Sequence, residues 1–216
     1  MRRLASLLLP LLLLAVLPLP SSPVRAQDES PGRFADGGLV LGLEYALLNN
    51  APLARGMAHA FMETGLPGMK HYVEIVDWGS MQSGPDAPID FGTLDLFVRE
   101  YQQRGFTELT MSLKGHSRWA SKDVRALAAT NGSPKPEYRD HYRRWIGAVV
   151  ERYDRDGVDD MPGLRWPVRY LEIGNEFSSY QPEPVEEYLE MLALAYEAAH
   201  AASDRVLVAH AAFLFT

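Results

Sequence analysis

Short runs of apolar, strand-forming residues alternate along the chain with longer stretches in which apolar residues recur every three or four positions. Five of the short runs are rich in Val, Ile and Leu, as strands buried on both faces of a parallel sheet usually are. We expect these strands to begin at Leu39, Tyr72, Glu108, Tyr170 and Arg205. The pattern predicts an α/β fold with a parallel sheet.

The longer stretches predict amphipathic helices. One is expected to begin at the capping residue Asp90 and to end at Gly105, and another carries an apolar stripe over residues 138–153. A weaker helical pattern covers residues 52–64. A further helix is expected to begin at Pro184. The residues that we expect this helix to bury are Val185, Tyr188, Leu189, Leu192 and Tyr196.

Alternation of strands and helices is compatible with a (β/α)8 barrel and with an open doubly wound sheet. An open sheet usually binds a nucleotide through a glycine-rich turn after its first strand. Here the first strand is followed by Glu44-Tyr45-Ala46, which has no such pattern. The sequence therefore favours the barrel. The Gly-, Ser- and Pro-rich segment 115–135 follows a strand, so we expect it on the face where barrels carry their chemistry.

The first 26 residues have the pattern of a secretory signal peptide. Two arginines precede an apolar run, and Val24 and Ala26 are small residues at the positions that favour cleavage. An uncleaved membrane anchor is the alternative, although prolines interrupt the run. We expect a secreted or periplasmic protein with a signal peptide (1–26), a polar lead-in (27–38) and a partial (β/α)8 domain (39–216).

The amino-acid composition excludes some kinds of functional site. The 216 residues include no cysteine, which excludes disulfides, thiolate metal sites and a cysteine nucleophile. The net charge of −7 becomes −10 once the three arginines of the predicted signal are removed, and this acidity argues against binding nucleic acid through its backbone. We expect no cofactor, and no membrane contact after signal cleavage. A barrel usually needs about 250 residues, more than this chain has.

The fourth predicted strand ends in Gly174-Asn175-Glu176. Glycosidases use a carboxylic acid to protonate the leaving oxygen, and a neighbouring amide can bind a sugar hydroxyl. Successive strand side chains point to opposite faces, so both residues reach one site only if Gly174 makes a bulge or ends the strand early. The alternative is a polar strand end that caps the next helix.

With this motif at the fourth strand, residues 138–176 resemble the clan A glycoside hydrolases, and the similarity extends over residues 39–216. The resemblance implies a retaining (β/α)8 enzyme that hydrolyses O-glycosidic bonds in an oligosaccharide, polysaccharide or glycoside. It implies that Glu176 is the general acid/base and that Asn175 binds a sugar hydroxyl. It also implies a nucleophilic glutamate at the end of strand seven.

The sequence departs from the family because the strand count stops at five, so no residue corresponds to the nucleophile. We expect either a piece of a longer gene product or a short protein that completes its barrel with another chain. A secreted carbohydrate-binding protein without turnover is the alternative function. The sugar, the linkage, exo or endo action and the oligomeric state stay open.

Several side chains that follow predicted strands are candidates for substrate contact, with core or loop packing as the alternative. They are Glu44, Trp78, His116, Trp119 and Tyr180. Indole faces suit the C–H surfaces of sugars, and a histidine can bond a hydroxyl. Glu172, on the fourth strand itself, is interpreted as structural, and it needs a cationic partner if it points into the barrel.

Two further motifs lie outside the strand ends. An acidic loop is a weak candidate for calcium, because it offers oxygen ligands at alternating positions around a glycine. Its residues are Asp154, Asp156, Asp159 and Asp160. The sequence Asn131-Gly132-Ser133 has the pattern of a glycosylation acceptor, which the following Pro134 disfavours.

Overall fold

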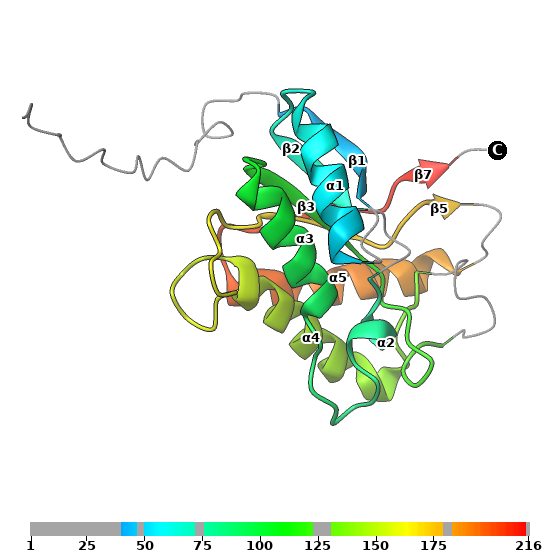
Figure 1. Ribbon diagram of the computed structural model, residues 1–216. Coiled ribbons are helices and arrows are strands. Elements are labelled where there is room, and N and C mark those ends of the chain that lie inside the picture. The colour runs from blue at the N-terminus through cyan, green and yellow to red at the C-terminus, as the bar shows by residue number, and fades with distance from the viewer. Residues whose placement is uncertain (1–39, 47–49, 72–75, 123–130, 179–182, 215–216) are drawn as a thin grey trace, which may run out of the picture. The chain divides into compact units, whose positions relative to one another are not determined.

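The computed structural model describes residues 40–46, 50–71, 76–122, 131–178 and 183–214 (Figure 1). All of them belong to one unit of the chain, Arg33–Thr216. The predicted signal peptide, the lead-in and Tyr180 lie outside the described residues. Among the described residues, no helix has both the length and the apolar character that crossing a bilayer requires.

Five parallel strands form the main sheet, and their spatial order follows their order in the chain (Figure 1). They are β1 (Gly42–Ala46), β2 (Gly68–His71), β3 (Glu108–Leu113), β4 (Tyr170–Ile173) and β6 (Leu207–His210). A helix lies between each strand and the next, so the predicted strand–helix repeat with a parallel sheet is confirmed.

Strand β2 begins four residues before the predicted start at Tyr72, and residues 72–75 lie outside the described part. Its register explains the difference. Gly68 pairs with Gly42 of β1 and with Glu108 of β3, so the backbone is already in the sheet over a stretch in which Met69 is the one apolar side chain. Hydrophobic pattern alone carries no signal for such a start.

Four helices confirm the predicted positions within one or two residues. They are α1 (Ala51–Met62), α3 (Gly92–Gln103), α4 (Arg139–Tyr153) and α5 (Val185–Ala202). The short helix α2 (Trp78–Met81) and a 3-10 turn over Pro136–Tyr138 were not predicted. Helix α3 starts just after the expected cap, and the Asp90 carboxylate accepts a hydrogen bond from the Gly92 N–H (2.8 Å). A second, two-stranded parallel sheet pairs β5 (Phe177–Ser178) with β7 (Phe213–Leu214).

The two faces of the main sheet differ. One face carries Met69, Met111 and Ile173, which are at most 1% exposed and belong to one hydrophobic core with the helices. Alternation along the strands puts Lys70 and Glu172 on the opposite face, which we call the inner face. The prediction that the strands are apolar on both sides is therefore wrong for the inner face, which carries charge.

Helix α5 buries only part of the predicted set. Tyr188 is buried and Leu192 packs against the core as expected, whereas Val185, Leu189 and Tyr196 are 50–54% exposed. The buried face consists of Tyr188, Met191, Leu194, Ala195, Ala198 and Ala199. Small residues explain the choice, because a methyl group built on Gly147 of α4 would already lie 4.0 Å from the Ala198 carbonyl. The helix turns its alanines toward α4 so that the two backbones can approach closely.

Candidate active site

The chain changes direction at the end of β4. The strand stops at Ile173, Gly174 has φ +85°, and Glu176 has φ +39°. The predicted early end of the strand at Gly174 is thus confirmed. Asn175 is half-buried and Glu176 is exposed, so its carboxyl group can reach a ligand in solution. A left-handed backbone at a non-glycine residue costs about 1–3 kcal/mol, so neighbouring groups must hold this turn.

Asn131 is one of the groups that hold it. Its Oδ1 accepts a hydrogen bond from the Asn175 N–H (2.7 Å), across 44 residues of sequence. A methyl group at Gly174 would lie only 2.6 Å from the same oxygen, so the glycine is required both for its φ and for this contact. Asn131 is 4% exposed, and its burial disagrees with a glycosylated side chain.

Glu183, just before α5, fixes Asn131 in turn. Its carboxylate accepts hydrogen bonds from the Asn131 N–H (3.1 Å), the Ser133 N–H (3.0 Å) and the Ser133 hydroxyl (2.5 Å). The loop after β3 and the start of α5 are thereby tied together beside the β4 turn. Sequence reasoning missed Asn131 and Glu183 as site residues. The only signal was that segment 115–135 was expected at the carboxyl ends of the strands.

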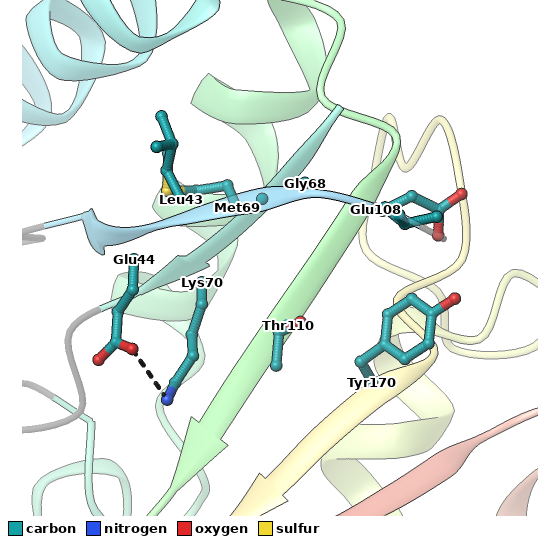
Figure 2. Close-up of a pocket in the computed structure, with 10 residues that line it drawn as sticks. Leu43, Glu44, Gly68, Met69, Lys70, Glu108, Thr110 and Tyr170 are labelled. Atoms are coloured by element: carbon teal, nitrogen blue, oxygen red, sulfur yellow. Dashed lines mark ion pairs between the residues drawn. The ribbon is translucent and has the colours of Figure 1, made fainter. Parts of the chain in front are cut away.

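A charged layer crosses the inner face. Lys70 of β2 pairs with Glu44 of β1 (Nζ–Oε2 3.2 Å), as Figure 2 shows. Lys70 also pairs with Glu172 of β4. Ser112 of β3 donates its hydroxyl to Glu172 (3.0 Å). The expectation that Glu172 needs a cationic partner is confirmed. Glu44 is exposed, but it lies within β1 and does not follow the strand, contrary to the expectation, because β1 runs on to Ala46. Its contact with substrate stays a prediction.

A pocket of about 340 Å³ opens on the inner face, and Figure 2 shows the side chains that line it. Gly42, Gly68, Glu108 and Tyr170 in its lining are the first residues of their strands. The pocket therefore lies toward the amino ends of the strands, whereas Glu176 follows a carboxyl end. It is distinct from the candidate catalytic position.

Trp78 does not offer a surface to substrate. The side chain is 0% exposed, and its indole N–H donates to the Gln82 side chain (2.9 Å). Its ring stacks on Trp145 with 6.0 Å between centroids. The prediction of substrate contact is corrected, because Trp78 opens the short helix α2 and turns inward to fill the core.

Trp119 and His116 lie after β3, as expected. The Trp119 ring is half-buried, packs against Trp78 and Tyr138, and donates its N–H to the Gln82 carbonyl (2.8 Å). Its contact with substrate stays a prediction. His116 is only 2% exposed, and the backbone of Gly132 lies directly against it. The described structure therefore gives His116 almost no surface for a ligand, contrary to the prediction.

The acidic loop brings Asp154, Asp156 and Asp160 together, with ligand oxygens within 4.8 Å of one another, while Asp159 is not among them. The Asp160 carboxylate accepts hydrogen bonds from the backbone N–H groups of Arg155 and Gly157, both at 2.9 Å. The loop precedes β4, at the end of the sheet opposite Glu176. These contacts order the loop, and they give calcium no support beyond the grouping of the carboxylates.

Solved structures with similar folds share this arrangement of strands and helices. The endoglucanase Cel5A of Pseudomonas stutzeri is similar with a TM-score of 0.55 and 16% identity, over 82% of this chain and 53% of that one. A β-galactosidase from Halorubrum lacusprofundi is similar with a TM-score of 0.57 and 14% identity, over 80% and 36%. The likeness shows an α/β fold with a parallel sheet, like that of these glycoside hydrolase structures over the part that is covered.

This chain spans about half the length of the endoglucanase. The endoglucanase Cel5A of Thermotoga maritima gives the same proportions, with a TM-score of 0.50, 12% identity, and coverage of 81% of this chain and 51% of that one. No protein-family model and no curated protein matches the sequence. The likeness to glycoside hydrolases is therefore one of fold, and the five parallel strands correspond to part of the barrel.

Proposed function

We propose that this chain carries the acid/base half of a retaining glycoside hydrolase that cleaves O-glycosidic bonds in an oligosaccharide, polysaccharide or glycoside. The observation that supports it is the position of Glu176. The residue is exposed just beyond the carboxyl end of the fourth strand, on a turn that Gly174 makes and Asn131 holds. This is the end of a barrel at which active sites are built.

In the proposed reaction, Glu176 donates its proton to the leaving oxygen as the glycosidic bond breaks. A second carboxylate about 5 Å away attacks the anomeric carbon and forms a glycosyl-enzyme. Glu176 then removes a proton from water, which hydrolyses that intermediate. The family resemblance assigns the second carboxylate to the seventh strand of the complete barrel. The main sheet described here has five strands, and the short strand β7 is not one of them. The Asn175 amide would bond a sugar hydroxyl beside the reacting carbon.

Substitution of Glu176→Gln in the full-length protein, which contains both this residue and the nucleophilic carboxylate, tests the proposal. The amide cannot donate the proton, so kcat for an unactivated glycoside should fall by about 100- to 10,000-fold. An aryl glycoside with a good leaving group needs less protonation in its first step and should lose less. Initial rates on both substrates, compared at several pH values, measure the difference.

Glu186→Gln is a matched control, because Glu186 is an exposed glutamate in the first turn of α5. Its activity should equal that of the unsubstituted protein. Undiminished hydrolysis of both glycosides by the Glu176→Gln variant would overturn the assignment. Sugar binding without hydrolysis by the unsubstituted protein that also contains the nucleophilic carboxylate would instead favour a carbohydrate-binding role and contradict the proposed reaction.

A further inference from the structure

Resting on the proposed function, we infer that Asn131 is a positioning residue for the acid/base Glu176. It does not touch the substrate in this role. It acts through the backbone of Asn175, whose N–H it binds, and thereby sets the direction in which the next residue leaves the strand.

The geometry couples three features at one point. Gly174 has a left-handed backbone, the Asn131 side chain occupies the space where a Gly174 side chain would be, and Glu176 is left-handed as well. Without the hydrogen bond, the Asn175 N–H would lose its partner and Glu176 could relax to the favoured negative φ. The relaxation would swing its carboxyl group away from the position set by the turn.

Asn131 is itself rigidly placed, which a positioning role requires. Glu183 binds its backbone N–H, and the same carboxylate binds both donors of Ser133. Asn131 and Ser133 are each 4% exposed. Glu183, just before α5, binds the loop after β3, and Asn131 of that loop binds the turn after β4. Three segments that are distant in sequence therefore fix the direction of Glu176.

Asn131→Ala in the full chain removes the acceptor. Misplacement of a catalytic group by about 1 Å costs about 100-fold, so kcat should fall by about that factor while KM changes much less. Asn131→Asp keeps an acceptor oxygen at the same place and should restore most of kcat. Asn50→Ala is the matched control, since it deletes an asparagine Oδ1 that accepts a backbone N–H (2.8 Å) at the start of α1, far from the turn in sequence.

Hydrogen exchange of the Asn175 amide supplies a readout that does not depend on activity. The amide should exchange at least tenfold faster in Asn131→Ala than in the unsubstituted protein, and stay protected in Asn131→Asp and Asn50→Ala. Faster exchange with no fall in kcat would overturn the positioning role. Unchanged exchange would overturn the hydrogen bond itself. If Glu176→Gln is fully active, the proposed function fails, and the exchange experiment still tests the contact.

Discussion

Lys70 joins two carboxylates that come from different strands. Its side chain is 20% exposed and that of Glu172 is 12% exposed, whereas Glu44 is 48% exposed. The two ion pairs therefore contribute differently to the stability of the fold. Water screens the Glu44 pair, but Glu172 has lost most of its hydration and depends on Lys70 and Ser112 for compensation.

Lys70→Met should therefore destabilise the fold by about 1–3 kcal/mol, because it leaves the Glu172 carboxylate poorly compensated on the inner face. Glu44→Gln should cost less than about 0.5 kcal/mol. Urea unfolding of both variants measures the difference. In a double-mutant cycle, adding Glu172→Gln to Lys70→Met should recover part of the loss. Equal effects of Lys70→Met and Glu44→Gln would contradict this account.

Helix α5 shows what an amphipathic pattern can and cannot predict. Its start at Pro184 and its length follow from local sequence, since proline sets the first turn and no breaker interrupts it. Two apolar stripes are present, and one contains Leu189 and Tyr196 while the other contains Met191 and Ala195. The choice between them depends on close approach to α4, which is a property of the partner helix.

Substitutions on the two stripes should lower the free energy of unfolding by amounts that differ several-fold. Met191→Ala removes a side chain that is 0% exposed and should cost about 2–5 kcal/mol. Leu189→Ala, at a position 54% exposed, should cost less than about 1 kcal/mol. Thermal unfolding of the 216-residue chain compares them. A larger loss for Leu189→Ala would mean that the buried face of α5 is assigned wrongly.

Over the whole molecule, the strand–helix order and the turn at Gly174 were predictable, because each depends on residues near one another in sequence. The charged layer was predictable only in part. A glutamate on a buried strand predicted that Glu172 needs a cationic partner, but no neighbouring residue in the sequence indicated that Lys70 of β2 would supply it. Asn131 and Trp78 were misjudged for the same reason, since their roles depend on contacts 44 and 67 residues away, with Asn175 and Trp145.

One buried tyrosine, Tyr101, and one half-buried tyrosine, Tyr170, should make the fold sensitive to alkali. Burial raises the pKa of Tyr101 to about 12, and burial, with the nearby Glu108 charge, raises the pKa of Tyr170 to about 12. In an unfolded chain both would ionise near pH 10. Their contribution to stability is therefore complete below about pH 10 and is lost as the pH rises toward 12.

Urea unfolding at a series of pH values should show stability falling above about pH 10. Tyrosinate absorbance should rise together with the loss of structure. Tyr101→Phe removes one of the ionising groups, so its stability should decline less steeply over the same interval. A folded protein whose Tyr101 ionises near pH 10 would contradict the effect of burial.

Because Glu176 has a left-handed backbone, the residue that would best stabilise the fold at this position differs from the residue that the proposed activity needs. Glycine, asparagine and aspartate adopt this conformation more readily than glutamate does. Selection for thermostability alone would favour replacing Glu176 with one of them, and each replacement would shorten or remove the proposed proton donor. The persistence of glutamate under such selection would itself indicate that the protein is retained for its chemistry and not for its fold.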